Sequence, residues 1–267
     1  MLDEITFFSN NIIGGEVMIQ TKEYELFKKF ATIRKKGWIK SKREGSTGIG
    51  YTFESLLNIT ENSLPIADYN GIEIKTMRIL SKKYIHLFNA APDGDFLYPY
   101  ERILESVGYP SKRNPKYKVF LSAAYGNEYT NIGYSKKVKL YVNRNEQKID
   151  FIVTDRFYNK IKVDVSWSFD LIKSKLEQKI KKLALIKTAH KFDNKQEYFY
   201  YKRIEFYKIK DFETFLKLIE DGTIKICFKI NVYTTGVKEG KMDNHGTDFS
   251  IKEEEIEKLF NKINIFQ

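Results

Sequence analysis

Asp68-Tyr-Asn-Gly-Ile-Glu-Ile-Lys75 is the stretch of this chain that predicts its fold. The Asn-Gly pair at its centre is a strong two-residue hairpin signal, because both residues tolerate the positive φ angles of a type I′ turn. In such a hairpin Tyr69 pairs with Ile72, and Asp68 falls directly opposite Glu73, where cross-strand Cβ atoms are about 5 Å apart and like charges repel. A divalent cation between the two carboxylates would compensate this repulsion, since Mg²⁺ prefers oxygen ligands.

The side chains beside this turn form a candidate catalytic group. Because side chains alternate along a strand, Lys75 shares the face of Glu73 while Ile74 points into the core. Upstream, Thr47-Gly-Ile-Gly-Tyr-Thr-Phe-Glu54 predicts a glycine-rich entry into a helix, with Glu54 at the margin of its buried face. Three carboxylates and one ammonium around a single point are the equipment of a Mg²⁺-dependent nuclease. The alternative is a surface hairpin with a solvated Glu54, because Asp-x₄-Glu-x-Lys is a loose pattern in a chain rich in Lys and Glu.

Composition narrows the class of protein. A chain of 267 residues with 42% hydrophobic residues predicts a globular protein of one domain in two lobes, or of two small domains. No apolar run approaches the roughly 18 residues of a membrane span. The single cysteine, Cys227, excludes intramolecular disulfides and favours a reducing cytoplasm, and the three histidines lie too far apart in sequence for zinc-ligand spacing.

The net charge of +11 favours a polyanionic partner, because each phosphate neutralised by Lys or Arg releases counterions. The alternative is a composition bias, since Lys, Asn, Ile, Tyr and Phe are all abundant, as A/T-rich coding produces. The basic, glycine-rich loop of residues 40–50 lacks the Gly-Lys-Ser/Thr of a P-loop and does not complete a dinucleotide fingerprint, which argues against a nucleotide site.

Hydrophobic periodicity predicts the order of the elements. We expect helices over 18–38, 167–188 and 211–220, and a further helix through Phe53, Leu56 and Leu57 that follows the loop of residues 40–50. We also expect a strand continuing from Lys75, a meander over 136–155 and 160–166, and strands over 196–209 and 223–233. Residues 89–135 have poor periodicity, which predicts loops with short elements and a candidate DNA-approaching arm. On the helix over 167–188, capped by Ser168, the lysines at 173, 175, 179, 181 and 182 are expected on a solvated face, and a DNA surface is the alternative.

The strand over 223–233 alternates strictly, so Lys229 and Tyr233 share an exposed face with Cys227, which lacks a paired histidine base and is expected to be inert. A flexible polar loop is expected over residues 236–247. Its candidate contacts to phosphates and base edges are Lys238, Lys241, Asn244 and His245. The alternative is an ordinary hairpin loop.

At these residues the chain resembles the MvaI/BcnI-type restriction endonucleases of the PD-(D/E)xK superfamily, and more distantly the mismatch-repair nickase MutH. The resemblance covers most of the chain. It rests on Gly37-Trp38, Lys42 through Glu54, Asp68 through Thr76, Trp167-Ser-Phe-Asp170 and the closing His245-Gly-Thr-x-Phe249.

The resemblance implies an α/β (α+β) fold, with a mixed sheet flanked by helices and two lobes around a DNA cleft. We expect a catalytic lobe over residues 1–190 and a DNA-recognition lobe over 191–267. The resemblance further implies that Asp68, Glu73 and the Ile74 carbonyl hold the catalytic Mg²⁺, with Mn²⁺ able to substitute, that Lys75 orients the attacking water, and that Glu54 completes the site.

For DNA contacts, the resemblance places Tyr233 and His245 near the bases and Lys229 where relatives carry an arginine. Asp243 and Thr247, on either side of His245, are further candidate DNA contacts. The chain departs from its relatives at Asp243-Asn244, which precedes His245-Gly-Thr247, and at Ser250, which stands where they carry a further arginine. A bidentate arginine discriminates guanine by about 1–3 kcal/mol, so we expect a different recognition sequence.

Three functions fit these observations. The first is a type II restriction endonuclease that hydrolyses double-stranded DNA to 5′-phosphate and 3′-hydroxyl ends, works as a monomer by sequential nicking and pairs with a DNA methyltransferase. The second is a MutH-like strand-specific nickase. The third, of another class, is a non-catalytic DNA-binding module, which would gain nothing from carboxylates that face phosphates.

Overall fold

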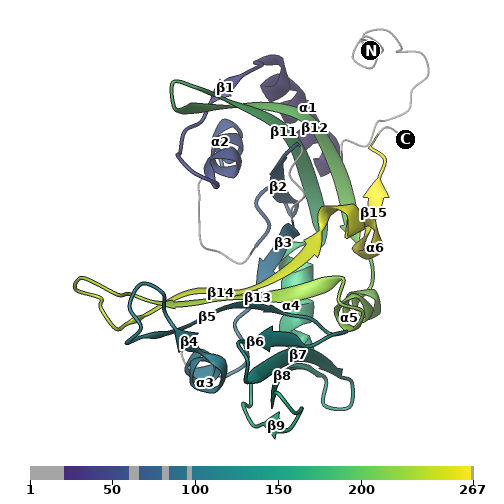
Figure 1. Cartoon of the computed structure of the whole chain (residues 1–267). Coiled ribbons are helices and arrows are strands. Elements are labelled where there is room, and N and C mark those ends of the chain that lie inside the picture. The colour runs from purple at the N-terminus through teal and green to yellow at the C-terminus, as the bar shows by residue number, and fades with distance from the viewer. Residues whose placement is uncertain (1–20, 60–65, 80–83, 95–97, 266–267) are drawn as a thin grey trace.

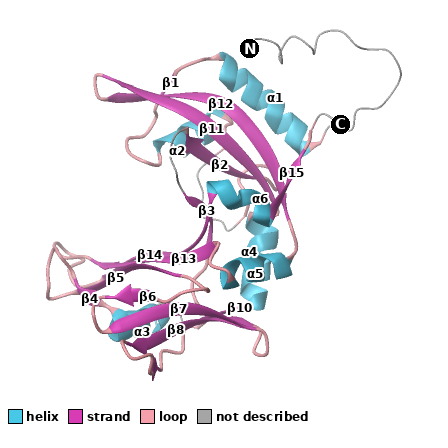
Figure 2. Ribbon diagram, turned by 45° about the vertical axis from the view of Figure 1, so that its right-hand side comes forward, coloured by secondary structure: helices cyan, strands magenta, loops and turns pink. Residues whose placement is uncertain are grey.

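The computed structural model describes residues 21–59, 66–79, 84–94 and 98–265. It contains three β-sheets with flanking helices, and Figure 1 shows one sheet in an upper lobe and two in a lower lobe. Figure 2 shows that α4 (Phe169–Lys179) lies where the two lobes join. The mixed α+β architecture agrees with the predicted fold class. Residues 18–20 of the first predicted helix lie outside the described ranges.

The first sheet contains Glu73 to Lys75, the second half of the stretch that predicts the hairpin. Its strands follow the order β1-β12-β11-β2, and β15 also pairs with β12. Only β2 and β11 are parallel among these pairs, and β2 forms an edge of the sheet. The lobe boundary expected near residue 190 falls inside the antiparallel β11–β12 pair. The strand bounds are β1 (Ile39–Lys40), β2 (Glu73–Arg78), β11 (Lys182–Asp193), β12 (Gln196–Ile209) and β15 (Phe260–Ile263).

The predicted helix over 167–188 is wrong in its second half. Ser168 caps α4 as expected, but the helix ends at Lys179 and β11 begins at Lys182. Residues 183–188 are buried without interruption, because this strand pairs on both edges and is covered on both faces. A short continuous apolar run fits a buried strand as well as a helix, and periodicity alone does not separate the two.

Helices cover the two faces of the first sheet. On one face, α1 (Lys22–Lys35) and α2 (Gly48–Leu56) pack Phe30 and Phe53 against Tyr201 of β12. The ring centroids of Phe53 and Tyr201 are 4.9 Å apart. On the other face, Leu176 of α4 belongs to the same apolar cluster as Met77 of β2. The edge strand β2 is therefore held between α2 and α4.

The second sheet corrects the expectation for residues 89–135, which are not mainly loops. Strand β5 pairs with β13 inside this sheet, and a ten-residue helix, α3 (Tyr98–Val107), precedes it. The sequence did not predict β5, because Ala123 and Ala124 have low β propensity. Val119 and Phe120 of this strand are buried by tertiary packing. The strand order is β3 (Tyr84–Asn89), β14 (Met242–Lys252), β13 (Ile224–Val232), β5 (Lys118–Ala124) and β4 (Tyr109–Pro110).

The loop predicted over 236–247 is also shorter than expected, because β14 already begins at Met242. The register between β13 and β14 shifts between Phe228 and Ile230, and Gly246 adopts φ 84° there. This is the geometry of a β-bulge with a left-handed glycine. Gly246, which in the sequence suggested a loop, is therefore the bulge residue of β14.

The third sheet contains the predicted meander over 136–155, whereas the strand expected over 160–166 is reduced to β9 and the first residue of β10. Its strands follow the order β10-β8-β7-β6, and β9 also pairs with β8. The remaining helices, α5, η2 and α6, lie between β12 and β15 along the chain. The bounds are β6 (Thr130–Ile132), β7 (Lys136–Asn143), β8 (Lys148–Asp155), β9 (Lys160–Ile161), β10 (Ser166–Ser168), α5 (Phe212–Glu220), η2 (Glu253–Glu255) and α6 (Ile256–Leu259).

A cluster of aromatic side chains joins the second and third sheets. Trp167 is fully buried, with its ring centroid 6.2 Å from Phe228 and 6.0 Å from Phe249, and its indole nitrogen donates to the Ala90 carbonyl at 2.9 Å. Within the described ranges, no helix combines the length and apolarity that crossing a membrane requires.

Candidate active site

The hairpin turn has the predicted geometry. Tyr69 and Ile72 form an antiparallel bridge, with N–H···O distances of 3.0 and 2.8 Å in the two directions. Between them, Asn70 and Gly71 have φ angles of 48° and 87°, as a type I′ turn requires. The turn thus fixes where β2 begins.

The two acidic residues beside the turn meet in a different way from the one predicted. Strand pairing stops at the Tyr69–Ile72 bridge, so Asp68 and Glu73 are not a cross-strand pair. Instead, the Asp68 carboxylate accepts a hydrogen bond from the Ile74 amide at 2.9 Å. Both carboxylates still converge, because Lys179 Nζ lies 3.7 Å from Asp68 Oδ1 and 3.0 Å from Glu73 Oε2.

Glu73 is the most buried member of this group, with 1% of its surface exposed. Lys75 shares its face as predicted, and Lys75 Nζ lies 2.6 Å from Glu73 Oε1. Burial raises the pKa of Glu73 and Asp68 adds to this, whereas the charges of Lys75 and Lys179 work in the opposite direction. Ile74 points to the other side, where it belongs to the core beneath α1 and α2.

Glu54 approaches β2 from the opposite face. A Cβ atom on Gly50 would lie 3.6 Å from Glu54 Oε1 and 3.5 Å from Thr76 Oγ1, which places Glu54 beside Thr76. Thr76 and Lys75 point to opposite faces of the strand, because neighbouring residues alternate. The role of Glu54 in completing the metal site therefore stays a prediction.

Lys179 is the functional candidate that the sequence reasoning missed. We expected it on a solvated helix face, but it is the last residue of α4 and pairs with both carboxylates. Burial lowers its pKa, and the charges of Glu73 and Asp68 outweigh burial and raise it. No sequence signal marks this lysine, because its role depends on how α4 packs against β2.

A second polar group lies on the second sheet, close enough to Lys75 for the charge of this lysine to affect the pKa of His86. The Asp248 carboxylate is buried and lies 3.5 Å from His86 Nε2 and 3.0 Å from Lys229 Nζ. Burial lowers the pKa of His86, Asp248 opposes this shift, and the charge of Lys75 adds to it. The sequence pattern did not single out His86 as a functional residue.

The predicted DNA contacts surround the end of the β13–β14 hairpin. Lys238 Nζ lies over the Tyr233 ring, 5.4 Å from its centroid, and a hydrogen bond to Asp243 raises the pKa of Tyr233. Lys241 is exposed, and its carbonyl accepts from the Tyr233 amide at 3.0 Å. The side chains of Asn244 and His245 lie outside the described part of the structure.

The structure does not support Thr247 as a side-chain contact to DNA. It is fully buried, and its hydroxyl donates a hydrogen bond to the Ala90 carbonyl, which also accepts from the Trp167 indole. Its side chain is therefore closed off from a bound duplex and fixes β14 to the residue that follows β3.

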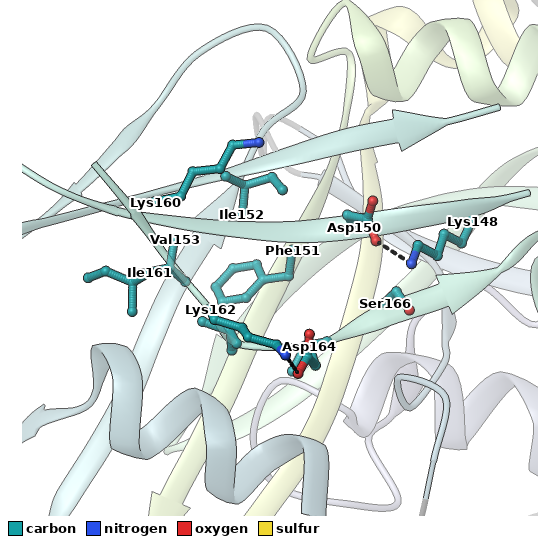
Figure 3. Close-up of a pocket in the computed structure, with 12 residues that line it drawn as sticks. Lys148, Asp150, Phe151, Ile152, Val153, Lys160, Ile161, Lys162, Asp164 and Ser166 are labelled. Carbon is teal, nitrogen blue, oxygen red and sulfur yellow. Dashed lines mark ion pairs between the residues drawn. The ribbon is translucent and has the colours of Figure 1, made fainter. Parts of the chain in front are cut away.

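The cavity in Figure 3 lies away from this site. It has a volume of about 410 Å³ and opens between β8 and the segment 160–166 in the third sheet. Lys148 and Asp150 form an ion pair of 3.4 Å at its wall, and Lys162 and Asp164 form one of 3.7 Å. None of the residues predicted for catalysis lines it.

Comparison with known proteins agrees with the geometry. The model of the MvaI/BcnI restriction endonuclease family matches residues 27–260. A solved structure of restriction endonuclease MvaI with its cognate DNA substrate is 29% identical, covers 90% of this chain and 97% of its own, and superposes with a TM-score of 0.81. MvaI in the absence of DNA is 26% identical, covers 94% and 99% of the two chains, and has a TM-score of 0.60. No curated protein matches the chain.

Together, the fold and the acidic edge of β2 define a nuclease with a PD-(D/E)xK-type core. Within that class, the chain belongs to the MvaI/BcnI restriction endonuclease family. It is thus a type II restriction endonuclease, as the sequence predicted, and such enzymes depend in general on a divalent metal.

Proposed function

We propose that this enzyme is a Mg²⁺-dependent endonuclease that hydrolyses phosphodiester bonds in double-stranded DNA and leaves 5′-phosphate and 3′-hydroxyl ends. The observation that supports this most directly is the convergence of Asp68, Glu73 and Lys75 at one edge of the first sheet, with Glu73 almost fully buried. The greater similarity to MvaI with its DNA substrate than to MvaI without DNA, at TM-scores of 0.81 and 0.60, supports a DNA-binding arrangement.

The residues at the site fit a hard divalent cation. Glu73 Oε2 is buried, and its close charged neighbour is the Lys179 ammonium at 3.0 Å, so a cation already stabilises this oxygen. Mg²⁺ often binds one or two carboxylates and keeps several waters, so Asp68 and Glu73 with one backbone carbonyl would be enough protein ligands. Asp68, Glu73 and the Ile74 carbonyl would hold Mg²⁺ or, in its place, Mn²⁺, and the ion would supply Lewis acidity toward the phosphate and an activated water.

The side chains of the chain would then direct the hydrolysis. Glu73 holds Lys75 Nζ at 2.6 Å, so the ammonium faces the site in a fixed position. There it would orient the attacking water and offset the negative charge that grows on the phosphate oxygens. The water oxygen forms a bond to phosphorus, the bond from phosphorus to O3′ breaks, and O3′ takes up a proton to become the hydroxyl. Glu54 would complete the site from the α2 side.

We assign DNA recognition to the β13–β14 hairpin and the surface beside it. The candidates are Lys229, Tyr233, Lys238, Lys241, Asp243, Asn244 and His245, which supply cationic, aromatic and amide groups for phosphates and base edges. The catalytic lobe would centre on the first sheet and the recognition lobe on the second. Residues 191–267 would supply β13 and β14 to the recognition lobe.

The cellular setting follows from this activity. An enzyme that cuts DNA at a short site needs a DNA methyltransferase to protect the host genome. Because the described part of the chain contains one candidate active site, we propose a monomer that nicks the two strands in sequence. The single cysteine suits the reducing cytoplasm, where that DNA is found.

Incubation of supercoiled plasmid with the protein tests the proposal. With Mg²⁺ we expect discrete linear fragments, and excess EDTA should abolish cleavage. Glu73→Gln and Lys75→Met should each lower the cleavage rate roughly 10²–10³-fold or more, whereas the control Lys148→Met, in the third sheet, should not change it. Accumulation of nicked circles as the final product would favour the MutH-like nickase. Intact supercoiled plasmid with bound protein would favour the binding module.

A further inference from the structure

The Lys179 ammonium lies beside the two carboxylates of the site and balances part of their negative charge. Its Nζ atom is within 4 Å of three oxygens: Glu73 Oε2 at 3.0 Å, the Ile66 carbonyl at 3.1 Å and Asp68 Oδ1 at 3.7 Å. Two carboxylate oxygens and a backbone carbonyl are also the kind of oxygen set that a hard cation takes. The ammonium therefore stands where two of the three proposed metal ligands, the Asp68 and Glu73 carboxylates, converge.

The main chain fixes this lysine to the site. The Ala67 amide donates to the Gln178 carbonyl at 3.2 Å, so the segment that carries Asp68 is tied to the last turn of α4. Ion pairing in two directions and the Ile66 contact leave the Lys179 side chain only 22% exposed. This defined position differs from that of Lys181, which lies just beyond the end of α4, is 55% exposed and pairs with Glu177 of that helix.

The charged side chains around Lys179 affect how a metal ion would bind. Asp68 and Glu73 contribute two negative charges, and Lys75 and Lys179 contribute two positive charges, so the group is neutral before a metal arrives. A divalent ion at the carboxylates would then lie a few ångströms from two ammonium groups, and charges at this distance interact strongly in a partly buried site. Lys75 binds the other oxygen of Glu73, whereas Lys179 contacts both acidic side chains.

We propose that Lys179 competes with the divalent metal for Asp68 and Glu73 and so keeps metal affinity low until a DNA phosphate adds negative charge to the site. This inference rests on the proposed metal site. In it, Lys179 is a positioning residue, because it acts through the metal ligands. When metal binds, the Lys179 ammonium turns away from Glu73 Oε2 toward solvent or toward the incoming phosphate.

Calorimetric titration of the full-length protein with Mn²⁺, without DNA, tests the inference. Lys179→Met should bind Mn²⁺ at least tenfold more tightly than the wild type. Lys179→Arg keeps the charge and should stay within about threefold of the wild type. The control Lys181→Met should also leave the affinity unchanged. Lys179→Gln serves as a second neutral variant if Lys179→Met fails to fold, as judged by circular dichroism.

The outcomes separate this inference from the proposed function. Equal Mn²⁺ affinity of the wild type and the neutral variants would overturn the competition and leave the metal site intact. Absence of Mn²⁺ binding in every protein, with or without a DNA duplex, would overturn both. A crystal structure of the Mn²⁺-bound enzyme provides a further check. If Lys179 Nζ remains 3.0 Å from Glu73 Oε2 while the ion is bound, the proposed displacement of the ammonium is contradicted.

Discussion

Replacement of Arg78 by methionine should destabilise the protein, because it leaves a buried carboxylate without its main partner. Arg78, at the end of β2, reaches across β11 to Glu197 of β12. Its Nε and Nη2 atoms each donate to a different carboxylate oxygen at 3.0 Å. The side chains are 14% and 9% exposed, and the guanidinium lies 5.5 Å from the Phe199 ring centroid.

The expected loss in the free energy of unfolding depends on which partners Glu197 keeps in Arg78→Met. Removal of one partner of a buried ion pair costs roughly 3–5 kcal/mol, since the other charge stays desolvated. Here His190 Nδ1 still lies 3.0 Å from Glu197 Oε1, which favours the lower end, about 3 kcal/mol. For a chain of this size, that loss lowers Tm by about 6–12 °C. Arg78→Lys, which loses the bidentate geometry, should cost less.

Urea unfolding followed by the fluorescence of the two tryptophans measures these differences. The double variant Arg78→Met/Glu197→Met should recover at least half of the loss, because it removes both buried charges together. The matched control is Arg203→Met on β12, whose side chain is 65% exposed and should contribute less than about 0.5 kcal/mol. A loss below about 1 kcal/mol in Arg78→Met, or a double variant less stable than the single one, would refute the reasoning.

Two further predictions concern alkaline stability and the helix that carries Lys179. Burial, helped by Glu205, raises the pKa of Tyr207 to about 12, above the unfolded value of about 10. The stability from its protonated form is complete below pH 10 and is lost as the pH rises toward 12. Urea midpoints at pH 9 and pH 11.5 should therefore differ more in the wild type than in Tyr207→Phe, and equal differences would contradict this. Ser168→Ala removes the N-cap of α4, where Ser168 Oγ accepts from the Leu171 amide at 3.4 Å, and should cost about 1 kcal/mol in the same unfolding assay. An unchanged midpoint would show that the cap does not stabilise α4.

Local patterns predicted the elements whose signal is contained in a few neighbouring residues. The Asn70-Gly71 turn, the cap at Ser168 and the alternating strand β13 all follow from backbone preferences and side-chain periodicity. The elements that were missed depend on distant partners. Strand β11 looked helical because it is buried on both faces. Strand β5 looked irregular because β13, the long strand it pairs with, lies about a hundred residues further along the chain.

The sequence alone indicated the family and the class of enzyme, through the resemblance of several separated motifs. It also predicted that Asp68, Glu73 and Lys75 lie at one edge, because turn chemistry and strand alternation are local. Only the tertiary structure decided how their charges are balanced. The sequence predicted a like-charge pair that only a metal could relieve, whereas packing of α4 against β2 brings the Lys179 ammonium to both carboxylates. Such a contact joins residues more than a hundred positions apart, and its energy exists only once the helix and the sheet are packed.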